Sequence, residues 1–179
     1  WFEVERPTLR AGAPWLAVTR LTRAKIGDLF AWGEGLFDSR RPLILLGPMQ
    51  EDIALPAWVD YRGATHPEAL RREWFPQAAG LITLSRHDEG RPQVMIEAMA
   101  AGLPLIASDL PAHRDLIEEG GNGHLARSRE ALAAAIEDLA DPARNARAGL
   151  AARDKARREI GDWAAAAGRF RAAYRQLCP

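Results

Sequence analysis

Short apolar runs alternate with longer stretches of helical pattern along most of this sequence. The runs predicted to be strands are Trp15–Val18, Leu43–Leu46, 58–61, 81–84, 103–107 and 124–126. Helices are predicted at 24–35, 67–77, 93–101, 112–119, 129–139, 142–159 and Trp163–Leu177. Strands that alternate with helices pair in parallel, so the pattern predicts an α/β fold with a doubly wound parallel sheet, helices on both faces and a helical C-terminal tail.

The length of the chain, 179 residues, suits one domain with its own core. No Pro/Gly/Ser-rich linker divides it, so residues 1–179 are predicted to form a single domain, with 1–13 as a linker to an absent N-terminal domain and 160–177 as a C-terminal helix. The chain begins at Trp1 without a signal-like segment, which favours a portion of a longer polypeptide. The lone Cys178 and the absence of an apolar run of roughly 18 residues favour a reducing, cytoplasmic setting.

Charge is balanced overall, with 24 basic and 24 acidic residues, which argues against a nucleic-acid partner. The local exception is the tail, where three acidic residues (Asp154, Glu159 and Asp162) accompany a larger basic set. That set is Arg144, Arg147, Arg153, Lys155, Arg157, Arg158, Arg169, Arg171 and Arg175. The simplest interpretation is the solvated face of two helices; a peripheral contact with the inner face of a membrane, or a phosphate patch, is the alternative.

The segment "DEGRPQVMIEAMAAGLPLIAS" contains two glutamates, Glu89 and Glu97, on either side of a predicted helix start. Pro92 suits the first position of a helix because its missing N–H would be unpaired there. The amides of Gln93 and Val94 would then open the helix, and the positive end of its dipole would favour a phosphate group. The segment therefore predicts an anion site between the two glutamates.

The spacing of Glu89 and Glu97 argues against a catalytic pair. Eight helical residues cover roughly 12 Å, whereas the two carboxylates of a glycosidase lie about 5 to 9.5 Å apart. A ligand with hydroxyl groups at both ends and an anionic centre, such as a nucleotide sugar, fits the spacing better. Ordinary surface glutamates are the competing interpretation.

A second cluster follows the first predicted strand, where "VTRLTRAKIG" places Arg20 and Lys25. Both would lie at the carboxyl end of a parallel strand, where open α/β sheets bind ligands. Lys25 is one of only two lysines, with Lys155, among the 24 basic residues. A compact ammonium suits a diphosphate oxygen, although both side chains could simply flank the strand in solvent.

Motifs for other chemistries are missing from the sequence. No two Asp residues are separated by one residue, so no Mg²⁺ or Mn²⁺ site and no cofactor is predicted, and protein cations would have to neutralise a diphosphate. The four histidines show no metal-ligand spacing. No phosphate-binding loop with a Gly-Lys-Ser/Thr ending and no Gly-x-Gly-x-x-Gly loop occurs.

Residues 17–177 resemble the C-terminal, donor-binding half of retaining glycosyltransferases with the GT-B architecture, the family 4 group. The strongest segment is "SRHDEGRPQVMIEAMAAGLPLIASDLPAHRDLI", which is similar to the family's Ser…Glu-Gly…Glu-Ala-Met-Ala-x-Gly-x-Pro pattern. "TRLTRAK" resembles its Gly-Arg-Leu-x-x-x-Lys-Gly segment, and "DWAAAAGRFRAAYRQL" its Trp-bearing final helix. The resemblance implies a Rossmann-like domain that binds a UDP-, GDP- or ADP-sugar donor, beside an acceptor-binding N-terminal domain.

The resemblance also implies roles for individual residues. Arg20 and Lys25 would neutralise the diphosphate and assist catalysis, Glu89 would face the donor sugar, and Glu97 would bind the ribose. Backbone amides of Gly90, Arg91, Gln93 and Val94 would hold phosphate and sugar oxygens, and Ala64, Thr65 and His66 would contact the base.

The sequence departs from the family pattern at several positions. Thr19 and Ile26 replace glycines beside the Arg and the Lys, "LLGPMQ" lacks a richer glycine loop, and Arg91 stands where an apolar residue is usual. The predicted function is transfer of a hexose-type sugar with retention, in cell-surface polysaccharide or glycolipid synthesis, with little activity from this chain alone. The alternatives are a nucleotide-sugar epimerase of the same architecture and a non-catalytic α/β binding module.

Overall fold

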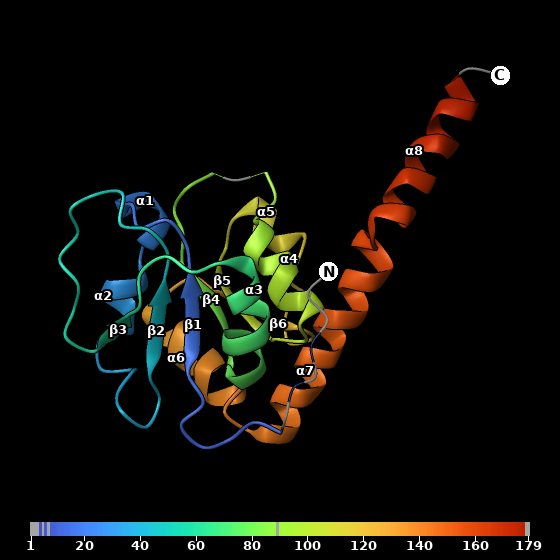
Figure 1. Cartoon of the computed structure of the whole chain (residues 1–179). Helices are drawn as coiled ribbons and strands as arrows, with labels where there is room; N and C mark the ends of the chain where they lie inside the picture. The colour runs from blue at the N-terminus through green and yellow to red at the C-terminus, as the bar shows by residue number, and fades with distance from the viewer. Residues whose placement is uncertain (1–3, 5, 7, 89, 178–179) are drawn as a thin grey trace.

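The computed structural model describes residues 4, 6, 8–88 and 90–177, and its centre is a six-stranded parallel sheet (Figure 1). The strands are β1 (Trp15–Val18), β2 (Leu43–Leu46), β3 (Val59–Tyr61), β4 (Gly80–Thr83), β5 (Leu105–Ser108) and β6 (Gly123–Ala126). Their order across the sheet is β3-β2-β1-β4-β5-β6. The order reverses between β1 and β4, and open α/β sheets bind ligands outside the carboxyl ends of the strands at such a reversal.

Helices follow most strands. They are α1 (Arg23–Ile26), α2 (Leu29–Gly33), α3 (Pro67–Ala69), α4 (Gln93–Ala100), α5 (Pro111–Arg114), α6 (Arg129–Asp138), α7 (Pro142–Lys155) and α8 (Trp163–Leu177). A π turn (Leu70–Trp74) and a 3₁₀ turn (Phe75–Gln77) continue α3, and a second π turn (Ala156–Ile160) continues α7. No helix in the described part of the chain has the length and apolar character that a membrane crossing requires.

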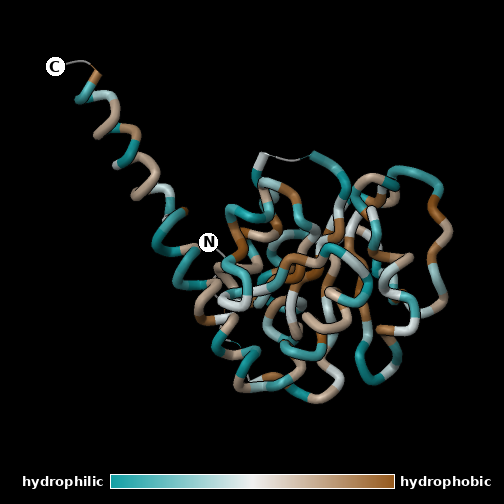
Figure 2. The backbone as a smooth tube through the Cα atoms, turned by 180° about the vertical axis from the view of Figure 1, so that it is seen from behind, coloured by the Kyte–Doolittle hydropathy of each residue, from teal (hydrophilic) through white to brown (hydrophobic). Residues whose placement is uncertain are grey.

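The core lies on both faces of the sheet because neighbouring residues of a strand point to opposite sides. Leu16 packs into one apolar cluster with α4 and α7, whereas Trp15 and Ala17 pack into the other with α1, α2 and α6. Apolar residues gather at the centre of the molecule, and most of the hydrophilic stretches lie toward its periphery (Figure 2). The alternation confirms the predicted doubly wound fold.

All six predicted strands are present, but two predicted helices are wrong in extent. The predicted helix 24–35 is two helices, because Gly27 has φ 54° and packs against the backbone just after β4; a Cβ there would lie 1.9 Å from the Leu84 oxygen. The predicted helix 112–119 ends at Arg114. Beyond it the chain turns around the buried Asn122, which accepts a hydrogen bond from the Glu118 amide and donates one to the Leu116 oxygen.

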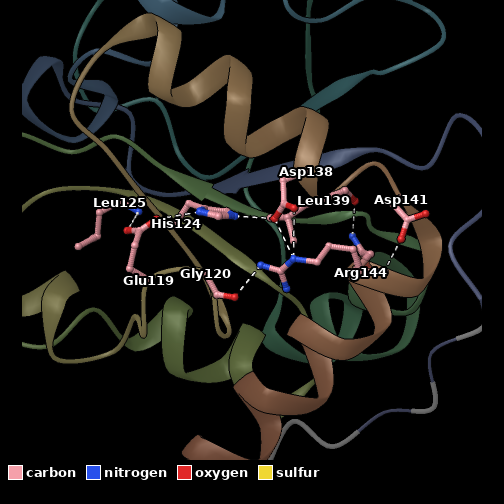
Figure 3. A network of polar contacts seen from close by, with 9 residues as sticks. Glu119, Gly120, His124, Leu125, Asp138, Leu139, Asp141 and Arg144 are labelled. Atoms are coloured by element: carbon pink, nitrogen blue, oxygen red, sulfur yellow. Dashed lines mark hydrogen bonds and ion pairs between the residues drawn. The ribbon is translucent and has the colours of Figure 1, made fainter.

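A polar network connects the edge strand β6 to the helices that follow it (Figure 3). The His124 ring places Nδ1 2.8 Å from Glu119 Oε1 and Nε2 2.7 Å from Asp138 Oδ2. Arg144 Nε lies 2.9 Å from Asp138 Oδ2, and its Nη2 donates to the Gly120 oxygen. The network therefore joins β6, α6 and α7.

The C-terminal helix α8 extends away from the rest of the molecule (Figure 1). None of its residues is buried, and Trp163, its first residue, is 91% exposed. The predicted bounds of this helix, Trp163–Leu177, agree with the structure.

Candidate functional site

The first predicted cation cluster lies just beyond the carboxyl end of β1. Arg20 is exposed in the segment between β1 and α1, and Lys25 is half-buried in α1. Thr22 begins this helix, because its Oγ1 accepts a hydrogen bond from the Lys25 amide at 3.2 Å. The cap fixes where the Lys25 side chain leaves the backbone.

The loop after β4 is bonded directly to α1. The Arg86 amide donates to the Ala24 oxygen at 2.8 Å, and the Asp28 amide donates to the Leu84 oxygen at 3.1 Å. Arg86 and Asp28 also form an ion pair, with Nε 3.0 Å from Oδ2. The structure thus brings the segment that carries Lys25 beside the loop that leads to Gly90.

The helix predicted after this loop begins as expected. Pro92 precedes α4, its carbonyl accepts the Met95 amide at 3.1 Å, and the amides of Gln93 and Val94 open the helix ahead of that bond. Gly90 and Arg91 are exposed at its approach. Amides at a helix start attract anions, and this one lies beyond the carboxyl end of β4, next to the reversal in strand order.

The two predicted glutamates are Glu89 and Glu97. Glu89 lies outside the described residues. Glu97 is half-buried in the second turn of α4, where burial raises the pKa of its carboxyl and a hydrogen bond from Gln93 Nε2 at 3.3 Å partly offsets that rise. Gln93 and Glu97 line a cleft of about 550 Å³. Its other wall is formed by Ile160 and the first turns of α8.

The predicted base-contacting residues Ala64, Thr65 and His66 follow β3, which is the outermost strand on the side of the sheet away from β6. They share the carboxyl edge with Arg20, but β2 separates β3 from β1. His66 Nδ1 accepts the Glu68 amide at 3.3 Å and begins α3. The structure therefore gives His66 a local capping contact and places this segment farther along the edge.

Three polar residues beneath the β4 loop were not predicted: Ser85, Ser108 and His113. All are buried, and they form a hydrogen-bonded chain from α5 to the loop. The sequence did contain a signal for two of them, because Ser85 and Ser108 each follow a predicted strand directly. Residues at the ends of neighbouring parallel strands meet at one edge of the sheet. Among the described residues, no group of three or more His, Cys, Asp or Glu side chains is arranged to hold a metal ion.

The chain is similar to glycosyltransferases in sequence. Residues 38–141 match the family model of the group 1 glycosyl transferases. A D-inositol 3-phosphate glycosyltransferase from Xylanimonas cellulosilytica is 34% identical over 123 residues, which cover 65% of this chain and 29% of that protein.

Solved structures share the fold. Sucrose-phosphate synthase from Thermosynechococcus elongatus is 27% identical with a TM-score of 0.77, and the match covers 94% of this chain and 46% of that one. Anabaena HepE in complex with UDP-glucose is 19% identical with a TM-score of 0.68, covering 83% and 45%. The chain therefore spans less than half the length of these relatives.

Proposed function

Because this chain belongs to the group 1 glycosyl transferases, we propose that it is the donor-binding domain of an enzyme that transfers a hexose-type sugar from a nucleoside diphosphate with retention of configuration. The relatives it resembles are about twice its length or more, and two of them are a glycosyltransferase and a protein in complex with UDP-glucose. A UDP-, GDP- or ADP-sugar is the proposed donor.

The observation that carries this proposal is the hydrogen-bonded junction between α1 and the β4 loop. It joins the segment bearing Arg20 and Lys25 to the loop that leads to the start of α4, at the reversal in strand order. Negative charge that develops on a departing diphosphate would meet two cations and a helix start, carried by segments that are hydrogen-bonded to each other. Such preorganised groups stabilise the transition state without rearranging during the reaction.

The glutamates would hold the two ends of the donor. Glu97, half-buried beside a cleft, would accept hydrogen bonds from the ribose hydroxyls, and Glu89 would face the sugar. Amides of Gly90, Arg91, Gln93 and Val94 would bind the oxygens between them.

Calorimetry with UDP, GDP and ADP tests the proposal. One of the three is expected to bind, and Arg20→Ala and Glu97→Ala are each expected to weaken binding about tenfold or more, the equivalent of one charged hydrogen bond. Arg40→Ala, an exposed arginine at the turn before β2, serves as the control and should bind like the parent. No binding of any nucleotide at millimolar concentration would favour a non-catalytic module instead.

The acceptor site and any general base are proposed to lie in a second, N-terminal domain of the same polypeptide. The chain alone should then bind nucleotide weakly and transfer little sugar. Robust transfer by this chain alone would contradict this part of the proposal, and release of an isomerised sugar without acceptor would indicate an epimerase.

The proposed setting is the cytoplasmic synthesis of a cell-surface polysaccharide or glycolipid. The exposed helix α8 carries Arg169, Arg171 and Arg175 and no acidic residue, a composition that suits an anionic membrane surface. Sedimentation with vesicles that contain or lack anionic lipid tests that contact, and equal recovery in both supernatants would exclude it.

A further inference from the structure

Ser85 lies where three segments of the carboxyl edge meet, and it is only 1% exposed. Its Oγ accepts a hydrogen bond from the His87 amide at 3.0 Å and donates to the Ala24 oxygen of α1 at 3.4 Å. Its main-chain oxygen accepts a hydrogen bond from Ser108 Oγ at 2.6 Å. One residue thus connects α1, the β4 loop and the end of β5.

The hydrogen atoms in this cluster can be assigned from the acceptors. A carbonyl oxygen only accepts, so the Ser108 hydroxyl must donate its single hydrogen to the Ser85 oxygen. By the same reasoning His113 Nδ1, 2.8 Å from the Ser108 carbonyl oxygen, carries a hydrogen and donates it. The Ser108 Oγ, 3.3 Å from the same nitrogen, can then act only as a further acceptor. The donors therefore run in one direction, from His113 through Ser108 to Ser85.

We propose that Ser108, oriented by His113, is a positioning residue that holds residues 85–88, the first part of the loop after β4, in the geometry needed to bind the nucleotide-sugar donor. This inference rests on the proposed function. Ser108 is 9% exposed and His113 is fully buried, so both act from beneath the loop through Ser85.

Buried polar side chains normally form hydrogen bonds, and the location of these bonds indicates that they also position the loop. Ser108 fixes the Ser85 carbonyl, and the Ser85 hydroxyl contacts both the loop, at His87, and the helix that carries Lys25. The adjacent Arg86 amide is bonded to the same Ala24 oxygen. Releasing Ser85 would therefore disturb the alignment of the loop with α1 while the sheet below remains paired.

The test compares Ser108→Ala with Ser108→Thr, which keeps the hydroxyl, and with Ser128→Ala as a matched control. Ser128 Oγ caps α6 by accepting the Ala131 amide at 3.2 Å, so its loss also removes serine hydrogen bonding, but away from the loop. Hydrogen exchange at the Arg86 and His87 amides reports on the loop, and calorimetry with UDP, GDP and ADP reports on binding.

Ser108→Ala is expected to speed exchange at these two amides about tenfold and to weaken nucleotide binding by a similar factor. Ser108→Thr should keep the exchange rates and the nucleotide affinity of the parent chain, and Ser128→Ala should change neither. His113→Phe, which keeps a ring and removes the donor, should change both in the same direction as Ser108→Ala.

The outcomes separate this inference from the proposed function. If the parent chain binds a nucleotide and Ser108→Ala binds it equally well, or if exchange at Arg86 and His87 does not change, the positioning role is wrong and the proposed function stands. If the parent chain binds none of the nucleotides, the proposed function is wrong and the positioning role falls with it.

Discussion

Two glycines with left-handed backbone conformations differ in their surroundings, and the difference gives a test of the junction between α1 and β4. At Gly27 (φ 54°) an added Cβ would lie 1.9 Å from the Leu84 oxygen, whereas at Gly63 (φ 74°) nothing lies within 4 Å. A left-handed conformation alone costs a non-glycine residue about 1–2 kcal/mol.

Gly63→Ala is therefore expected to lower the free energy of unfolding by about 1 kcal/mol. Gly27→Ala should lower it by about 3 kcal/mol or more, because backbone must also move to relieve the contact. Urea unfolding of the two variants measures both values. Equal losses would mean that α1 is not held tightly against the end of β4.

The carboxyl of Glu97 gives a second test at a single residue, through the pH dependence of binding. Burial raises its pKa, and only the ionised carboxylate accepts hydrogen bonds with both oxygens. Nucleotide affinity should accordingly fall as the pH is lowered through that raised pKa. This fall should begin at a higher pH than it would for an exposed glutamate.

Calorimetric titrations between pH 7.5 and about pH 4.5, around the ordinary glutamate value, measure this dependence. In Glu97→Gln, which has no titrating group, binding should be weaker at pH 7.5 and should lose that part of the pH dependence. A parent chain whose affinity stays constant across the range would exclude a role for the Glu97 carboxylate in binding.

The network around His124 predicts how firmly the edge strand is held by its helices. Each nitrogen of the ring lies within hydrogen-bonding distance of one carboxylate, Nδ1 of Glu119 and Nε2 of Asp138. Burial acts to raise the pKa of Asp138, but the hydrogen bond from His124 and the charge of Arg144 outweigh it, so this pKa lies below its usual value.

His124→Ala should lower the free energy of unfolding by about 1–2 kcal/mol, because it removes the side chain that bridges Glu119 and Asp138 through two partly solvated contacts. Arg40→Ala breaks an exposed ion pair with Asp38 and should have no measurable effect. Urea unfolding at neutral pH compares them. If His124→Ala is as stable as the parent, the network does not hold β6.

The positions of the strands followed from the sequence more reliably than the helix ends. Apolar runs such as Leu43–Leu46 are unambiguous because they are buried on both faces of the sheet. The break at Gly27 was not predictable, because it depends on contact with Leu84, which is remote in the chain. Local pattern contains no information about such a contact.

The candidate site was predictable to a similar degree. Arg20, Lys25 and the start of α4 could be placed at the carboxyl edge because each follows a strand closely. The cluster of Ser85, Ser108 and His113 was missed, since its bonds join the ends of two strands and a helix that only the folded chain brings together.

In the part of the chain that the structure describes, helix α8 projects from the rest of the molecule and has an exposed apolar face (Figure 1). Its large apolar side chains recur at helical spacing on one side: Trp163, Phe170, Tyr174 and Leu177. Each is at least 66% exposed, whereas stable folding normally buries such side chains. This helix therefore adds exposed apolar surface without adding a buried contact of its own to the core.

Truncation after Asp162 is accordingly expected to leave the free energy of unfolding within about 0.5 kcal/mol of the parent value, as for other changes outside the core. The same truncation should reduce self-association, because exposed apolar patches promote contacts between molecules. Urea unfolding measures the first effect and sedimentation velocity over a range of concentrations measures the second. The untruncated double variant Phe170→Ser/Tyr174→Ser is the matched control and should reproduce the loss of association with α8 present. A truncated chain that is destabilised by more than about 1 kcal/mol, a typical effect of a structural substitution, would show that α8 supports the domain after all.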